Sequence, residues 1–366
     1  MGKTLFVALW TTAFLTLVGC GSPSDTPTLE RRWEWKSAGK WGRALSLLEN
    51  PQSRELYVGV GFYEKAEVVA LSPNGETAWT TAISETRCPL CDTPAVNCRP
   101  VPTDDWSALW FGETQAAERS LWRVDPSAHT SAPVRLDHPE ALSRSVALCA
   151  ETTALTPDGA RFLRPGVWED SIYEIDRDGR ITNTFAFGKN VTQVVHLEGD
   201  EYLVVLYDVL DPYGEEPHES GMVLRWNHRT NESTVLSFPY LVREVVSSSG
   251  WIVALVDLNQ GKFRDGFAEI VLSGNHAEMR RLGDLVVENP IRFALRPEKR
   301  QIVVGYDYLD PDLRGRVRVF AADGELVATG RVSDTDIPTV NDIIVSHDGS
   351  TVYAASEWAV EAFALP

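Results

Sequence analysis

The chain has 366 residues, of which 52 are acidic and 34 are lysine or arginine, so its formal net charge is −18. An acidic surface repels phosphate backbones, and this composition excludes nucleic acid as an expected partner. The length would suit two domains. Internal repeats, rather than length, therefore have to decide the organisation.

The first 19 residues predict a secretory signal. They hold one lysine and then a mostly apolar run, residues 5–18, that three threonines interrupt. A membrane-spanning helix needs about 20 apolar residues. A charged start, a short apolar core and small residues at its end are instead typical of a cleaved signal peptide.

The end of this run, LVGC at residues 17–20, resembles the lipobox of bacterial lipoproteins. The resemblance implies that residues 1–19 are removed and that Cys20 carries the acyl chains of a stable lipid anchor. Gly21 stands where an aspartate would favour the inner membrane, so the same analogy implies the outer membrane, facing the periplasm or the cell surface. Ordinary secretion with a free Cys20 is the alternative. Residues 20–28 are small, polar and proline-rich, and we expect them to form a flexible tether.

Four further cysteines follow, and their number suggests disulfides. An even number of cysteines outside the cytoplasm is consistent with two bridges, for which three pairings are possible. A redox Cys-x-x-Cys motif or a zinc site are alternatives, but no βαβ pattern and no histidine cluster accompanies the cysteines. The disulfide candidates are Cys88, Cys91, Cys98 and Cys149.

The rest of the chain contains a sevenfold repeat. Seven times, a turn-like cluster is followed at once by an apolar, β-prone run, and successive runs start roughly 40 to 55 residues apart, the period of a four-stranded propeller blade. The runs are ELYVGV from Glu55, WSALWFG from Trp106, ARFLRPG from Ala160, EYLVVLY from Glu201, WIVALVD from Trp251, QIVVGYD from Gln301 and TVYAAS from Thr351.

Each run has a short strand-like segment before it and a third one after it, and six have a fourth behind a sharp turn. Asn74-Gly75, Asp178-Gly179 and Asp323-Gly324 are typical of two-residue hairpin turns. The seventh repeat stops after its third strand, whereas residues 31–37, RRWEWKS, form a spare strand before the first blade. Using that strand as the outer strand of the last blade would remove two exposed edges. The sequence therefore predicts an all-β, seven-bladed β-propeller of antiparallel four-stranded blades, one domain over residues 29–366.

Two repeats resemble known propeller families. NDIIVSHDGSTVYAAS, residues 341–356, resembles the YVTN-type and WD40-like repeat, and VVALSPNGETAWTT, residues 68–81, resembles the repeat of quinoprotein-like propellers. The vicinal cysteine pair of quinone-cofactor enzymes is absent from the sequence, so that cofactor is not expected. In predicted cellular location and repeat type, the chain is also similar to the propeller lipoprotein of the machinery that assembles outer-membrane β-barrels. That lipoprotein has eight blades, whereas seven are recognised here.

The longest predicted connections fall on one face of the propeller. In an up-and-down blade, the connections from second to third strand and between blades share one face, here called the decorated face, and the other turns share the opposite, short-turn face. Loops on a rigid scaffold commonly carry binding. The candidate binding rim on the decorated face comprises Tyr207, Asp208, Asp211, Asp257, Tyr306, Asp307 and Asp310.

Two interpretations of this rim remain open. Asp208, Asp257 and Asp307 occupy equivalent strand ends and could together hold a calcium ion, which takes several oxygen ligands. Alternatively, each aspartate caps its own loop, and Tyr207 and Tyr306, instead of stacking on a ligand, pack against neighbouring blades. No other metal or cofactor is expected.

No catalytic motif was found: the sequence lacks a Gly-x-Ser-x-Gly elbow and a His-Glu-x-x-His pair, and it has no Walker loop. The sequence favours a monomeric, non-enzymatic binding or scaffold module for an envelope protein, peptide or glycan, attached to the membrane through its lipid anchor only. The alternative is a lyase, lactonase or glycosidase with a metal or acidic site at the central channel, because propellers host many unrelated activities.

Overall fold

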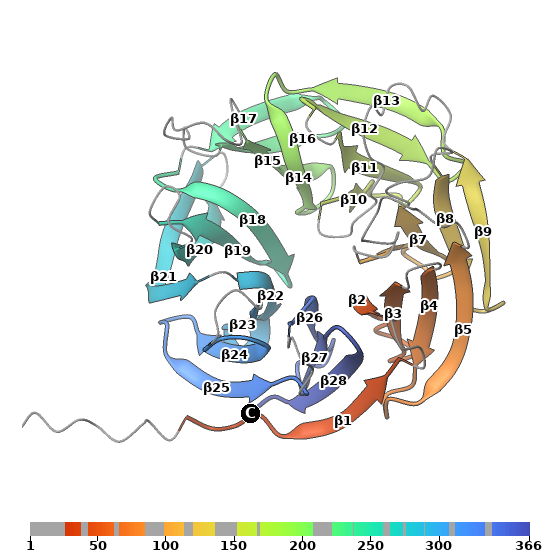
Figure 1. Cartoon of the computed structure of the whole chain (residues 1–366). Coiled ribbons are helices and arrows are strands. Elements are labelled where there is room, and N and C mark those ends of the chain that lie inside the picture. Colours follow the sequence, from red (N-terminus) through yellow and green to blue (C-terminus); the bar gives the residue numbers. More distant parts are fainter. Residues whose placement is uncertain are drawn as a thin grey trace, which may run out of the picture.

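The structure, a computed structural model, forms a ring of seven four-stranded antiparallel sheets (Figure 1). It describes residues 26–37, 43–61, 66–84, 99–112, 120–135, 152–166, 169–207, 222–236, 238–258, 264–273, 276–288, 290–306, 312–333 and 339–366. The prediction of an all-β, seven-bladed propeller is confirmed. Within these ranges no helix has the length and apolar character needed to cross a membrane.

The blades are numbered in chain order, and their strands run from the centre outward. Blade 1 consists of β2 (Arg43–Glu49), β3 (Leu56–Gly61), β4 (Ala66–Leu71) and β5 (Thr77–Ser84), and blade 2 of β6 (Val101–Pro102), β7 (Leu109–Gly112), β8 (Ser120–Asp125) and β9 (Thr130–Arg135). Blade 3 consists of β10 (Ala154–Leu155), β11 (Arg161–Pro165), β12 (Ser171–Asp176) and β13 (Ile181–Ala186), and blade 4 of β14 (Asn190–His196), β15 (Glu201–Tyr207), β16 (Met222–Asn227) and β17 (Glu232–Leu236).

Blade 5 consists of β18 (Leu241–Ser248), β19 (Trp251–Asp257), β20 (Arg264–Ser273) and β21 (His276–Glu288). Blade 6 consists of β22 (Pro290–Arg296), β23 (Gln301–Tyr306), β24 (Arg316–Ala321) and β25 (Leu326–Arg331). Blade 7 consists of β26 (Asp342–Val345), β27 (Thr351–Ala355), β28 (Ala359–Ala364) and β1 (Arg31–Lys36). One 3₁₀ turn, η1 (Pro297–Lys299), connects β22 to β23.

The seven apolar runs of the sequence are the second strands of the seven blades. Every residue of β3, β19, β23 and β27 is buried. Such strands are covered by neighbouring blades on both faces, which explains why they read as continuous apolar runs rather than as an alternating pattern.

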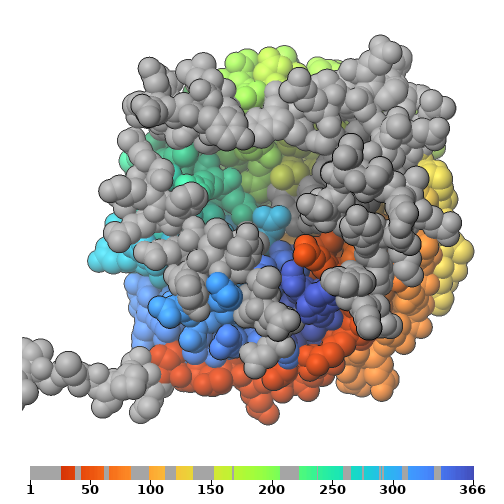
Figure 2. Space-filling view, in the orientation of Figure 1, coloured from red at the N-terminus to blue at the C-terminus, as the bar shows by residue number. Residues whose placement is uncertain are grey.

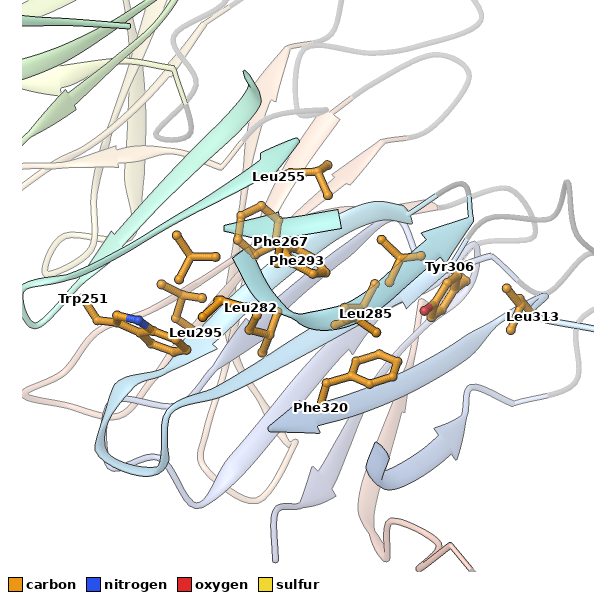
Figure 3. Close-up of a cluster of buried hydrophobic side chains, with 14 residues drawn as sticks. Trp251, Leu255, Phe267, Leu282, Leu285, Phe293, Leu295, Tyr306, Leu313 and Phe320 are labelled. Carbon is orange, nitrogen blue, oxygen red and sulfur yellow. The ribbon is translucent and has the colours of Figure 1, made fainter. Parts of the chain in front are cut away.

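The core lies between the blades. One cluster, shown in Figure 3, joins β19–β21 of blade 5 to β22–β24 of blade 6, and its rings Phe267 and Phe293 lie 5.1 Å apart at a steep angle. Leu282 and Leu285 reach this cluster from an irregular stretch of β21, where the pairing with β20 shifts register. Blade–blade packing therefore supplies the main apolar contacts of the ring.

The predicted ring closure is confirmed. β1 pairs antiparallel with β28, with Trp33 opposite Ala362. Trp33 Nε1 donates to the Pro73 carbonyl at 2.9 Å, and Trp35 Nε1 donates to Thr77 Oγ1 at 3.0 Å, both in blade 1. In Figure 2 this red strand borders the blue C-terminal blades along the lower rim.

The residues just before β1 are also attached to the ring. Thr28 forms a parallel bridge with Thr329 in β25 of blade 6. The Leu29 amide donates to the Thr329 carbonyl at 2.8 Å, and the Leu29 side chain is buried in the cluster between blades 6 and 7. The N-terminal segment thus contacts three consecutive blades.

Several predictions fall on residues outside the described ranges. These are the signal peptide 1–19, the first part of the tether, the lipidation site Cys20, and the disulfide candidates Cys88, Cys91, Cys98 and Cys149.

Candidate functional site

The predicted rim is described only in part. Tyr207 is the last residue of β15, Asp257 ends β19 and Tyr306 ends β23, so all three stand where second strands reach the decorated face. The remaining rim candidates, Asp208, Asp211, Asp307 and Asp310, lie outside the described residues.

Asp257 belongs to a buried charge cluster at this end of blade 5. It lies opposite Asp265 of β20 in the strand register, and both residues are almost fully buried, at 6 % and 2 % exposure. Arg243, the extra residue where the register of β18 shifts, places Nη2 3.0 Å from Asp257 Oδ2 and Nε 3.2 Å from Asp265 Oδ1. Burial raises the pKa of the Asp265 carboxyl, Arg243 lowers it, and Asp257 adds to the rise. One guanidinium therefore serves two carboxylates.

This cluster bears on the calcium hypothesis. Calcium in proteins is held by six to eight oxygen ligands, and Oδ2 of Asp257 already accepts a hydrogen bond from Arg243 Nη2 at 3.0 Å. The other two aspartates of the calcium hypothesis, Asp208 and Asp307, lie outside the described residues, so calcium binding at this rim stays a prediction. Across the ranges given above, no three or more histidine, cysteine, aspartate or glutamate side chains gather as metal ligands would.

Tyr306 packs within the ring rather than standing on the rim. Its side chain is 2 % exposed and belongs to the cluster between blades 5 and 6 (Figure 3). The Arg318 guanidinium lies over its ring, 5.6 Å from the centroid. Of the two interpretations of Tyr306, the structure supports packing.

A third buried aspartate lies on an innermost strand. Asp342 begins β26 and is 1 % exposed. Arg99 donates from Nη2 to Asp342 Oδ1 at 2.6 Å and from Nε to Oδ2 at 3.0 Å, and the Leu47 amide donates to Oδ2 at 2.8 Å. Asp342 therefore ties blades 1, 2 and 7 together near the channel.

A pocket lies on the short-turn face between blades 3 and 4. It measures about 230 Å³ and is formed by the β10–β11, β14–β15 and β16–β17 turns together with the start of β11. Its lining residues are Thr156, Pro157, Asp158, Arg161, Asp200, His228 and Arg229.

Glu174 of β12, with its side chain only 4 % exposed, holds two of these lining residues in place. It accepts from Arg161 Nη1 at 2.6 Å and from Thr182 Oγ1 at 2.7 Å, and the His228 Nε2 atom lies 2.6 Å away. Burial by itself would raise the pKa of Glu174, but these hydrogen bonds outweigh burial and lower the pKa below its usual value. Glu174 is therefore a stable anion that orients Arg161 and His228.

Sequence reasoning did not find this pocket. The sequence places the turns between first and second strands on the short-turn face and predicts ligand binding on the opposite, decorated face. The parts of the pocket lie as far apart in sequence as Thr156 and Arg229, so only the docking of blade 3 on blade 4 brings them together.

Comparison with known proteins shows likeness in fold alone. No protein family matches the sequence, and no curated protein matches it either. Among solved structures, Kuenenia stuttgartiensis hydrazine synthase superposes with a TM-score of 0.58 at 14% identity, over 87% of this chain and 94% of that one.

Two further structures are similar. The C-terminal WD40 domain of Sif2 gives a TM-score of 0.56 at 12% identity, over 93% of this chain and 99% of that one. Raptor from Chaetomium thermophilum gives 0.60 at 9% identity, over 93% of this chain and 30% of that one. The chain is thus a seven-bladed β-propeller with WD40-like structural neighbours.

Proposed function

We propose that the chain is a lipid-anchored β-propeller of the bacterial cell envelope that binds a protein, peptide or glycan through its decorated face and performs no catalysis. The observation that carries this proposal is the closed ring, in which β1 completes the seventh sheet. A rigid scaffold that positions connections at one face is a recurrent basis for binding, and a WD40 domain is among the structural neighbours.

The chemistry of these connections indicates the charge of the partner. The sequence between β15 and β16, residues 208–221, contains five acidic residues and no lysine or arginine, and residues 307–311 contain two acidic residues and no basic one. A partner with a basic surface would be attracted by this charge, and its association rate would fall as salt is added.

A charge-neutralised variant tests the binding proposal. Asp257 is left unchanged, because removing it would take away one of the two buried carboxylates that pair with Arg243. The test variant replaces four acids of the rim, Asp208→Asn, Asp211→Asn, Asp307→Asn and Asp310→Asn. The matched control replaces four exposed acids of the short-turn face, Asp178→Asn, Glu198→Gln, Glu232→Gln and Glu325→Gln.

Both variants are compared with the parent chain in pull-downs from solubilised envelope. The rim variant should lose the proteins or glycans that the parent and the control recover. Recovery of the same set by the rim variant would remove this face from consideration.

The lipid anchor is tested separately. Cys20→Ala should abolish labelling by an alkyne-tagged fatty acid and release the chain from the membrane fraction. Persistent labelling, or an unlabelled parent chain, would contradict the anchor without affecting the binding proposal.

A second candidate function rests on the carboxylate pair of blade 5. Arg243 pairs with both carboxylates, yet burial raises the pKa of Asp265, and two carboxylates with different proton affinities can separate the acid and base roles of a hydrolase. An enzyme of this kind would turn over aryl glycosides or lactones and would lose that activity on Asp265→Asn without losing its fold. Absence of turnover by the parent chain removes this candidate.

A further inference from the structure

The pocket between blades 3 and 4 contains guanidinium groups that are only partly used. Arg229 places Nε 2.7 Å from Asp200 Oδ2, and its side chain is 78% exposed. Arg161 uses Nη1 for Glu174. A guanidinium carries five N–H donors in a planar fork, and no other side chain of the described ranges accepts from these two, so each retains donors for an acceptor in the pocket.

The same pocket contains carboxylate oxygens that are partly used. Asp158 Oδ1 accepts from Thr156 Oγ1 at 2.6 Å and from the Ala160 amide at 3.0 Å, which leaves Oδ2 available. Asp200 uses Oδ2 for Arg229, which leaves Oδ1 available. Positively charged donors and negatively charged acceptors thus line the same pocket.

The walls of the pocket are built into the fold. The Tyr202 hydroxyl donates to the Leu155 carbonyl at 2.9 Å and so joins blade 4 to blade 3. His228 is held by Glu174 and lies against two rings, with centroid distances of 5.4 Å to Phe185 and 5.5 Å to Trp226. This part of the pocket is therefore held in place before a ligand binds, which lowers the ordering cost of binding.

We propose that this pocket binds a small zwitterion, an amino acid or dipeptide, with its carboxylate on Arg161 and Arg229 and its ammonium group on Asp158 and Asp200. A simple anion would meet the two aspartates, and a metal ion would meet the two arginines, so a ligand bearing both charges suits the lining best. A volume of about 230 Å³ is below the roughly 300–1,000 Å³ typical of drug-sized ligands. The site lies on the face opposite the decorated one and does not depend on the function proposed above.

Calorimetric titration of the full chain with L-alanyl-L-alanine tests the proposal. The dipeptide should bind saturably, and both its N-acetyl derivative, which lacks the ammonium group, and its C-terminal amide, which lacks the carboxylate, should bind about tenfold more weakly, since each loses one charged interaction.

Two variants assign the ends of the ligand. Arg229→Ala should weaken the dipeptide about tenfold while leaving the weak binding of the amide unchanged, because the amide has no carboxylate for Arg229 to bind. Asp158→Asn should weaken the dipeptide while leaving the N-acetyl form unchanged. Arg229→Lys, which keeps the charge, should retain most of the affinity and guards against a folding defect in the alanine variant.

Arg280→Ala is the matched control. Arg280 forms an exposed ion pair with Glu278 at 2.7 Å, the same distance as the Arg229–Asp200 pair, but on β21 outside the pocket. The proposal is overturned by absence of saturable binding up to about 50 mM. Equal affinity of the N-acetyl form, which would indicate a plain anion site, or an Arg280→Ala effect as large as that of Arg229→Ala, would overturn it too.

Discussion

Replacing Trp33 by alanine should loosen the closure of the ring. Trp33 stands in β1, donates from Nε1 to the Pro73 carbonyl of blade 1 at 2.9 Å, and lies 5.7 Å from the Tyr353 ring of blade 7. Its indole also covers Gly75, where an added Cβ would come within 2.6 Å of the ring. One side chain therefore joins the two ends of the propeller.

The size of the effect follows from these contacts. Truncating a fully buried tryptophan to alanine costs about 3–5 kcal/mol. Trp33 is half-buried, so we expect about 2 kcal/mol from lost packing and about 1 kcal/mol from the lost hydrogen bond. With an unfolding entropy of about 2.1 cal/mol/K per residue over roughly 340 residues, a loss of about 3 kcal/mol lowers Tm by about 4 °C.

Differential scanning calorimetry measures this shift. Trp33→Phe keeps a ring but loses the donor, and should lower Tm by about 1–2 °C. Val235→Ala, at a 53% exposed position of β17, is the control and should change Tm little. A Trp33→Ala protein that melts within about 1 °C of the parent would refute the closure argument.

Three further predictions concern glycine conformation and buried carboxylates. Gly75→Ala should cost at least about 1 kcal/mol more than Gly250→Ala, because both glycines have positive φ, +81° and +77°, but only the Cβ at residue 75 would strike Trp33; melting curves measure the difference. Burial raises the pKa of Glu361, so the stability it contributes is complete at low pH and is lost as pH rises through that raised pKa. The Tm of Glu361→Gln should therefore rise relative to the Tm of the parent chain as pH increases from about 4 to 8. The pKa of Glu174 is lowered by its hydrogen bonds, which outweigh burial, so its stabilising contribution is present above the unfolded pKa and is lost as pH falls through the lowered value. Glu174→Gln should cost about 3 kcal/mol near neutral pH, and the deficit should shrink in acid.

Each of these three has a contradicting result. Equal melting of the two glycine variants would mean that the Trp33 contact does not constrain residue 75. A constant Tm difference across the pH range would remove the buried-carboxylate argument for Glu361. For Glu174→Gln, a loss of stability that grows as pH falls would contradict a lowered pKa of Glu174.

The architecture could be predicted because each blade repeats a local signal. Turns such as Asp323-Gly324 join the third and fourth strands of a blade, and this glycine indeed has a φ of +93°. The spare strand could be placed because strand counting left one position open, and Trp33 and Trp35 now bond to blade 1. Local turn chemistry and a fixed strand count per blade need no knowledge of distant contacts.

The side-chain partners could not be predicted in the same way. Arg243 reaches Asp257 because a register shift inserts it as an extra residue in β18, and such a shift leaves no mark in composition or periodicity. The pocket needs Asp158 of one blade and Arg229 of the next to meet, which depends on how two blades dock. Tyr207, Asp257 and Tyr306 do stand at the ends of second strands, and what the rim binds stays a prediction.

The pairing of β1 with β28 also determines when the ring can close during synthesis. Arg32 Nη1 donates to Thr351 Oγ1 at 2.6 Å across 319 residues, so the earliest strand to be synthesised must wait for the latest. Individual blades use consecutive strands and can form during synthesis, whereas joining the ends requires closing a very long loop and is expected to be late and slow. A nascent or truncated chain that has not reached β28 keeps two unpaired edges, which are attachment points for chaperones and for aggregation.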